Sequence, residues 1–184
     1  MDEEVLAAFA EKVLLPSKEV AHWRAPAPRE AVPRPRADEV GSFLTSHEPG
    51  LGYPAHWFLH GLLNEWGLEL QHLNLTGVLH VAGFITVYEA FLGMETHVDL
   101  FRQIFSGRAL SVGKPPRTTP VGGFTLQKKP KPSTPYPAYS PYDSNWGWHG
   151  EWFYIRNPVK APFSTFTKRR SERRESWSWG PTSR

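Results

Sequence analysis

Residues 77–92 read GVLHVAGFITVYEAFL and form the most apolar stretch of this 184-residue chain. Its apolar residues recur at helical spacing on one face and also cover much of the remaining circumference. A helix that is apolar nearly all round lies at the centre of its fold. The stretch contains His80 and Glu89 and lacks basic flanks, which favours a buried helix over a membrane span.

We therefore predict a central helix over residues 76–92, which Thr76 caps and Gly93 ends. Its core positions are expected to include Leu79, Ile85 and Phe91. The charged Glu89 should be hydrogen-bonded as a structural anchor, either to a loop amide or to Arg102.

Shorter helices are predicted on both sides of the central helix. Residues 2–14 carry apolar groups at the spacing of an amphipathic helix. Pro54 stands at the start of AHWFLHGLLNEW, and Gly67 is a natural stop for it. Thr96 precedes HVDLFRQIF as a cap, and Asp38 precedes a short helix that passes through residues 43–44.

Strand character appears only after residue 107. Residues 121–127 and 152–155 are predicted to pair as a small β hairpin or sheet. In the segment SNWGWHGEWFYIRN (residues 144–157), bulky groups fall on both sides of an extended chain, so Trp152 and Phe153 are expected in the core. The alternative, a platform for stacking nucleobases, would favour more basic residues between the rings than Arg156 alone. The fold class is thus mainly α with a small β hairpin or sheet (α+β).

Composition divides the chain into three predicted parts. Residues 1–19 form an N-terminal amphipathic helix, residues 20–158 a compact helical domain, and residues 159–184 an irregular, basic, Trp-containing tail. Within the domain, residues 24–36 are Pro-rich and are expected to be extended and poorly packed.

Charge is distributed unevenly along the chain. Residues 1–106 carry a net charge of −7, residues 107–132 carry +6, and residues 159–184 carry +5. Basic segments of this kind are candidates for phosphate binding, although such runs are most often simply solvated. The candidate nucleic-acid-binding residues are Arg108, Lys114, Arg117, Lys128, Lys129, Lys131, Lys168, Arg169, Arg170, Arg173 and Arg174.

The chain lacks the active-site residues that several enzyme classes need. The chain has no Cys, which removes a thiol nucleophile and any Cys-based zinc site. Neither an Asp-Thr/Ser-Gly turn of aspartic proteases nor the Tyr-x-Asp-Asp turn of reverse transcriptases occurs. His56 and His60 are spaced as metal ligands on one helix face, but the Glu of the zinc-protease motif does not follow His56, and ordinary imidazoles are the favoured interpretation.

An ordered series of motifs resembles the gypsy-type transposon domain of plants, also called the gypsy-type transposase. The series includes DEVGSF, HEPGLGYPAHWFLHGLLNEWGLELQHLN, LHVAGFITVYEAFLGMETHVDLFRQIF, VGGFTLQ and SNWGWHGEWFYIRNP, over about residues 20–181. The resemblance implies a retroelement-derived plant protein, and it implies no defined activity.

The expected function is that of a non-catalytic binding or assembly module, as in the gag-like region of a retroelement. The alternatives are nucleic-acid binding through the loop 108–131 and the tail 168–174, and a divergent nuclease or transposase. We expect no catalytic residues, no metal, no cofactor, no small-molecule substrate and no membrane. The partners would be nucleic acid or a second copy of the chain. The acidic N-terminus is unlike a secretory signal, so an intracellular location, cytoplasmic or nuclear, is expected.

Overall fold

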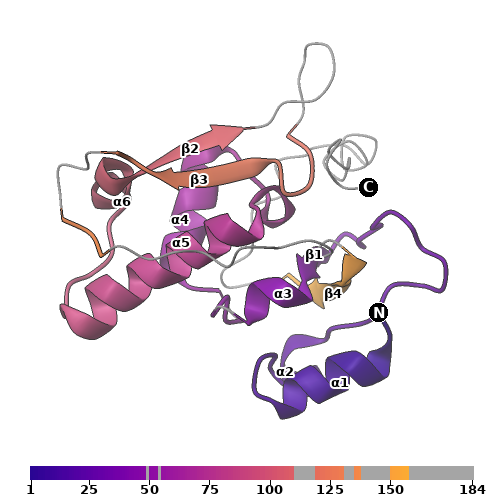
Figure 1. Ribbon diagram of the computed structural model, residues 1–184. Coiled ribbons are helices and arrows are strands. Elements are labelled where there is room, and N and C mark those ends of the chain that lie inside the picture. The colour runs from indigo at the N-terminus through magenta and orange to yellow at the C-terminus, as the bar shows by residue number, and fades with distance from the viewer. Residues whose placement is uncertain (49, 54, 110–118, 131–134, 138–149, 158–184) are drawn as a thin grey trace.

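A long central helix organises the fold (Figure 1). The computed structural model describes residues 1–48, 50–53, 55–109, 119–130, 135–137 and 150–157. Helix α5 (Leu75–Ile85) continues into the π-helical segment η2 (Thr86–Phe91), and helices α4 (Trp57–Trp66) and α6 (Val98–Ile104) lie beside it. The predicted order of these helices is therefore confirmed. None of the helices in the described ranges has the length and apolar character needed to cross a bilayer.

Three phenylalanines join the three helices. Phe58 of α4, Phe84 of α5 and Phe101 of α6 are each fully buried. Their ring centroids lie 5.2 Å (58–84), 5.0 Å (84–101) and 5.6 Å (58–101) apart. Aromatic pairs at such separations combine burial with favourable ring geometry. This cluster is the centre of the core.

The helix starts differ from those predicted. The side chain of Asn74 accepts a hydrogen bond of 2.7 Å from the N–H of Gly77, so Asn74 and not Thr76 caps α5. Helix α6 is capped by His97, because the hydroxyl of Thr96 is used elsewhere. The predicted stops are confirmed, since Gly67 and Gly93 have φ of 61° and 62°.

The strands form two separate antiparallel pairs, and the predicted pairing is wrong. Strand β4 (Trp152–Arg156) pairs with β1 (Glu39–Phe43), and β3 (Phe124–Lys128) pairs with β2 (Phe105–Ala109). Strand β2 begins directly after α6, which places it beside β3. The segment predicted as a helix from Asp38 is instead β1, and only the four residues of α3 (Leu44–His47) after it are helical.

The N-terminal region packs against this assembly. It contains two helices, α1 (Glu3–Glu11) and α2 (Lys18–Ala21). Helix α1 lies within the predicted amphipathic helix, and Asp2 caps it. A short 3-10 turn, η1 (Leu70–His72), precedes α5. Leu6 and Leu15 are buried in the same apolar cluster as the residues of α4 and α5.

The predicted core residues have mixed outcomes. Trp152 and Phe153 are buried as expected, and Leu79 and Ile85 are partly buried. Phe91 is 79% exposed, so its predicted place in the core is wrong. The reason is the π-helical turn: the N–H of Leu92 donates to the carbonyl of Val87, five residues back, at 3.1 Å. The wider turn rotates residues 86–91 away from the 3.6-residue period used in the prediction.

We expect Gly107→Ala to lower the free energy of unfolding by about 1–3 kcal/mol, because overpacking strains a filled site. A Cβ at position 107 would lie 2.3 Å from Cζ of Phe124, whose buried ring also contacts Trp66. Chemical denaturation measures the effect. Gly52→Ala is the matched control, since no atom lies within 4 Å of its added Cβ, and equal losses in the two variants would contradict the packing argument.

Candidate functional site

The structure does not gather the predicted basic residues into one cluster. Of that set, only Arg108, Lys128 and Lys129 lie within the described ranges, and the others fall outside them. Arg108 is exposed on β2 opposite Thr125, whereas Lys128 lies near the other end of the hairpin, opposite Phe105. The ammonium of Lys128 donates to the carbonyl of Tyr136 at 2.9 Å. The described part of the basic site is therefore two separated ends of one hairpin.

His56 does not pair with His60 but caps helix α4. Its Nδ1 accepts from the N–H of Phe58 at 3.2 Å, and its Nε2 lies 3.0 Å from Oε2 of Glu89. A neutral imidazole with its proton on Nε2 satisfies both contacts, because Nδ1 must be the acceptor. Within the described residues, no group of three or more His, Asp or Glu side chains could hold a metal ion.

Glu89 is the anchor that the sequence predicted, with a loop amide as its partner. Its Oε1 accepts from the hydroxyl of Thr96 at 2.6 Å and from the N–H of Thr96 at 3.3 Å. The hydrogen bond from the Thr96 hydroxyl is the main reason that the pKa of Glu89 lies below its ordinary value. The predicted alternative partner, Arg102, instead pairs with Glu65 at 2.8 Å. Glu89 thus ties η2 both to the following loop and to the start of α4.

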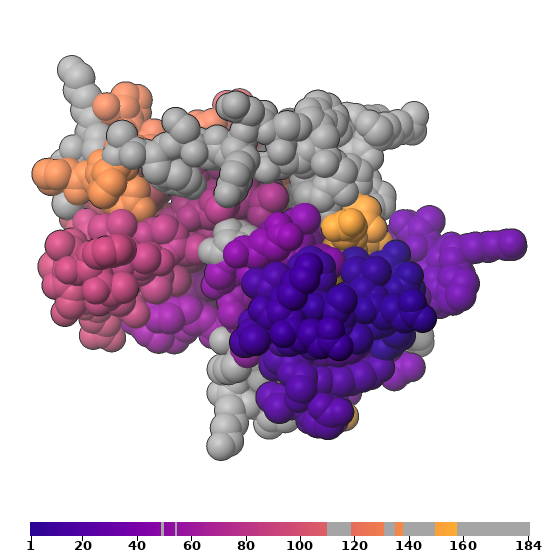
Figure 2. Space-filling view, turned by 60° about the horizontal axis from the view of Figure 1, so that its bottom comes forward, coloured from indigo at the N-terminus to yellow at the C-terminus, as the bar shows by residue number. Residues whose placement is uncertain are grey.

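Large apolar side chains are exposed on both segments that Glu89 joins. Trp57 is 50% exposed, and Phe91, Leu92 and Met94 are 79%, 56% and 50% exposed. The ring of Trp57 lies 5.4 Å from that of His56, which bonds to Glu89, and Phe91 follows Glu89 by two residues. We call Trp57, Phe91, Leu92 and Met94 the apolar patch. In Figure 2 the pink segment that carries most of it lies on one side of the molecule, away from the indigo helix α1.

The sequence prediction missed this patch. It placed Phe91 in the core and gave Trp57, Leu92 and Met94 no functional role. The signal that was available is the density of large apolar residues in AFLGM (residues 90–94), around the glycine that ends the helix. A helix end beyond its packing partners exposes such residues to solvent or to a partner.

A buried serine–histidine pair resembles part of a nucleophilic site. Ser42 and His47 share a hydrogen bond of 2.9 Å between Oγ and Nε2, and they are only 2% and 4% exposed. The ring of Phe153 lies 5.4 Å from the imidazole. Burial lowers the pKa of His47 from 6.5 to about 4, so the ring is neutral near pH 7. No substrate reaches a hydroxyl this deeply buried, and the pair acts as a core hydrogen bond.

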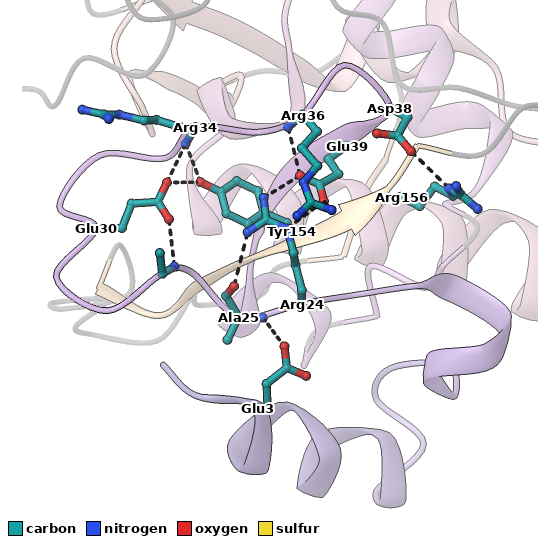
Figure 3. Close-up of polar contacts among 11 residues, drawn as sticks. Glu3, Arg24, Ala25, Glu30, Arg34, Arg36, Asp38, Glu39, Tyr154 and Arg156 are labelled. Carbon is teal, nitrogen blue, oxygen red and sulfur yellow. Dashed lines mark hydrogen bonds and ion pairs between the residues drawn. The ribbon is translucent and has the colours of Figure 1, made fainter.

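A polar network fastens the N-terminal segment onto β4 (Figure 3). The guanidinium of Arg24 donates to both carboxylate oxygens of Glu39, at 2.7 and 2.6 Å, and lies 3.9 Å from the centre of the Tyr154 ring. The Tyr154 hydroxyl donates to Glu30 at 2.6 Å and accepts from the N–H of Arg34. Most of residues 24–36 are exposed, in line with the prediction of poor packing, but Arg24, Glu30 and the backbone of Arg34 anchor the segment to one buried tyrosine.

Charge complementarity stabilises this network. Burial alone would raise the pKa of Glu39, but the two Arg24 hydrogen bonds hold it below the ordinary value. Burial raises the pKa of Tyr154. Every group in the network has a partner inside the fold, so we assign it a structural role.

A shallow groove of about 330 Å³ lies between α5 and residues 136–137. Its lining includes Leu79, Gly83 and Tyr136, together with Thr86, whose hydroxyl already donates to the carbonyl of Ala82 at 2.9 Å. Ligand pockets start near this volume but add several convergent polar groups. The groove offers almost none among its described residues.

Comparison with known proteins gives one match. Residues 41–109 match the model of the family described as "Putative gypsy type transposon". The comparisons with curated proteins and with solved structures gave no match. The matched range runs from β1 through α5 and α6 to the end of β2, and it contains the whole apolar patch. The chain is thus similar to the gypsy-type transposon family over residues 41–109, which is less than half of its length.

Proposed function

We propose that this retroelement-derived domain is a non-catalytic assembly module that associates with a second copy of itself through the apolar patch. The single observation that carries the proposal is the exposure of Trp57, Phe91, Leu92 and Met94 on two segments joined by Glu89. Aromatic residues and Met are enriched at protein interfaces, whereas a monomer surface rarely gathers them in one place.

The patch is also well ordered for binding. The bonds of Glu89 to His56 and Thr96 fix α4, η2 and the loop after Gly93 relative to one another. The N–H of Met94 donates to the carbonyl of Tyr88 at 2.8 Å, which fixes the loop a second time. A pre-organised surface loses less conformational entropy on association.

A second copy is the partner that this surface suits. A twofold dimer needs one self-complementary patch, because the same surface of each copy contacts that surface of the other. The patch side chains are uncharged, so two copies meet without like-charge contact between them. His56 and Glu89, the polar groups that join the two segments of the patch, are already bonded to each other.

The test is light scattering coupled to size exclusion, over a range of protein concentrations. We expect the wild-type mass to rise with concentration and the double variant Phe91→Ser/Met94→Ser to stay monomeric with an unchanged melting temperature. Val20→Ser is the matched control, because Val20 is 72% exposed on α2, outside the patch. A wild-type protein that stays monomeric, or a double variant that still assembles, would contradict the proposal.

Nucleic-acid binding through the basic segments stays a prediction. The described residues Arg108 and Lys128 lie at different ends of the β2–β3 hairpin, so no observed cluster favours it. Binding of a single-stranded oligonucleotide at two salt concentrations tests it, because phosphate contacts release counterions and weaken steeply with salt.

A further inference from the structure

Strand β2 presents an exposed edge. It pairs with β3 on one side, and the two strands form a two-stranded sheet with no other described strand beside β2 (Figure 1). Residues 106–109 are all exposed. Natural proteins protect such edges with charges, prolines or bulges, because an open edge is a template for another strand.

The ladder shows which backbone groups face outward. The N–H of Lys129 donates to the carbonyl of Ile104 at 2.8 Å. In an antiparallel pair, hydrogen-bonded positions recur every second residue, so Ser106 and Arg108 bond to β3. The amide and carbonyl of Gly107 and the amide of Ala109 then point to the open edge.

The two faces of β2 differ in chemistry. Phe105 and Phe124 are both buried on the inner face, which leaves Gly107 and Ala109 as the exposed residues of β2 on that side. Arg108 is exposed on the outer face and makes no ion pair with any other residue in the described ranges. A strand added at this edge would therefore meet Gly107 and Ala109 on one side and the charge of Arg108 on the other.

We propose that the free edge of β2 binds an extended acidic peptide by strand addition. The peptide takes the outward backbone groups of Gly107 and Ala109, places a carboxylate beside Arg108, and packs an alternate apolar side chain over Gly107 and Ala109. Strand addition gives affinity through main-chain bonds and specificity through alternate side chains. This surface is separate from the apolar patch, so it goes beyond the assembly proposed above.

The probe is a fluorescein-labelled heptapeptide of alternating valine and glutamate, measured by fluorescence anisotropy. We expect saturable binding that weakens about tenfold or more in Arg108→Glu and in Ala109→Pro, which removes one outward amide without removing a β3 bond. Methylation of alternate backbone nitrogens of the peptide should abolish binding. The valine–lysine peptide should bind the wild type only weakly and the Arg108→Glu variant better.

Two protein controls separate this proposal from others. Lys12→Glu reverses an exposed charge on the remote α1 region and should leave binding unchanged. The Phe91→Ser/Met94→Ser variant should bind the peptide normally, so failure of self-association and failure of strand addition are distinguishable. The proposal is overturned if the peptide does not bind, if the methylated peptide binds equally well, or if an oligonucleotide of about 20 bases binds more tightly and competes through Arg108.

Discussion

Phe153→Ala should lower the free energy of unfolding by about 3–5 kcal/mol, the usual cost of truncating a fully buried phenylalanine. Phe153 is 0% exposed in the middle of β4, where its neighbour across the strand pair is Ser42. Its ring packs near the imidazole of His47, with centroids 5.4 Å apart. The cavity would open in the main apolar cluster, which contains both Phe153 and Phe58, so the surrounding helices limit its collapse.

Phe91→Ala is the matched control, because it removes the same atoms from a ring that is 79% exposed. We expect a change within about 0.5 kcal/mol in the monomer, as for most surface substitutions. Urea denaturation at low protein concentration measures both variants without a contribution from assembly. A loss at position 91 as large as the loss at position 153 would show that the π-helical end of the central helix is packed and not exposed.

A third variant, Trp152→Ala, tests the role of the aromatic segment. If its rings formed a stacking platform, Trp152→Ala would weaken oligonucleotide binding by about 1–3 kcal/mol per stacked base and leave melting unchanged. The burial of Trp152, Phe153, Tyr154 and Ile155 favours the opposite pattern, a fall in melting temperature. Residues 144–149 of that segment lie outside the described ranges.

The helices could be predicted because their signals are local. Apolar spacing located α4, α5 and α6, and Gly67 and Gly93 marked two of their ends. The caps were harder to predict, since Asn74 and Thr76 are both good capping residues and only the tertiary contact of a neighbour decides between them. Thr96 illustrates the point, because its hydroxyl serves Glu89 and leaves His97 to begin α6.

The strand partners could not be predicted in the same way. All five residues of β1 are buried, including Glu39 and Ser42, so the strand lacks the alternation that marks a half-exposed strand. Glu39 is tolerated there because Arg24 neutralises it, and that contact depends on residue 154 holding the N-terminal segment in place. Pairing between residues 39 and 156 is a property of the whole fold and leaves no local mark in the sequence.

Only part of the candidate site could be predicted from the sequence. Glu89 stood out as a charge in an apolar helix, and this position predicted that it needs a hydrogen-bond partner, either a loop amide or Arg102. The exposure of Phe91 could not be predicted, because a single π-helical turn changes which side of the helix each later residue faces. A prediction that assumes an unbroken α-helix will therefore place an interface residue in the core.

Acid should destabilise the protein well above the pH at which its carboxylates protonate, and His47 should be a major cause. Burial lowers the pKa of His47 to about 4, against an ordinary value of 6.5, and its nearest polar partner is the uncharged hydroxyl of Ser42. Above pH 6.5 the ring is neutral in both states and contributes no pH dependence. Below pH 6.5 the unfolded chain binds a proton that the folded protein excludes, so stability falls by about 1.4 kcal/mol per pH unit.

Between pH 6.5 and 4 this single group should remove about 3 kcal/mol from the free energy of unfolding. Burial also lowers the pKa of His60 and of His80, which adds loss in the same direction. Glu39 and Glu89 lower the stability only when the pH falls below their ordinary pKa of 4.5. The reason is that hydrogen bonds hold their pKa values lower in the folded state.

The His47→Gln variant isolates the contribution of His47. Glutamine keeps a nitrogen or oxygen within reach of Ser42 and does not titrate, so the variant should lose less stability than the wild type as pH falls from 6.5 to 4.5. Urea denaturation at half-unit pH steps measures both slopes, and an NMR titration of the His47 ring in the folded protein gives its pKa directly. Identical slopes, or a ring that titrates near 6.5, would mean that water or a counter-charge reaches His47, and the interior around Ser42 and Phe153 would then be more open than these contacts imply.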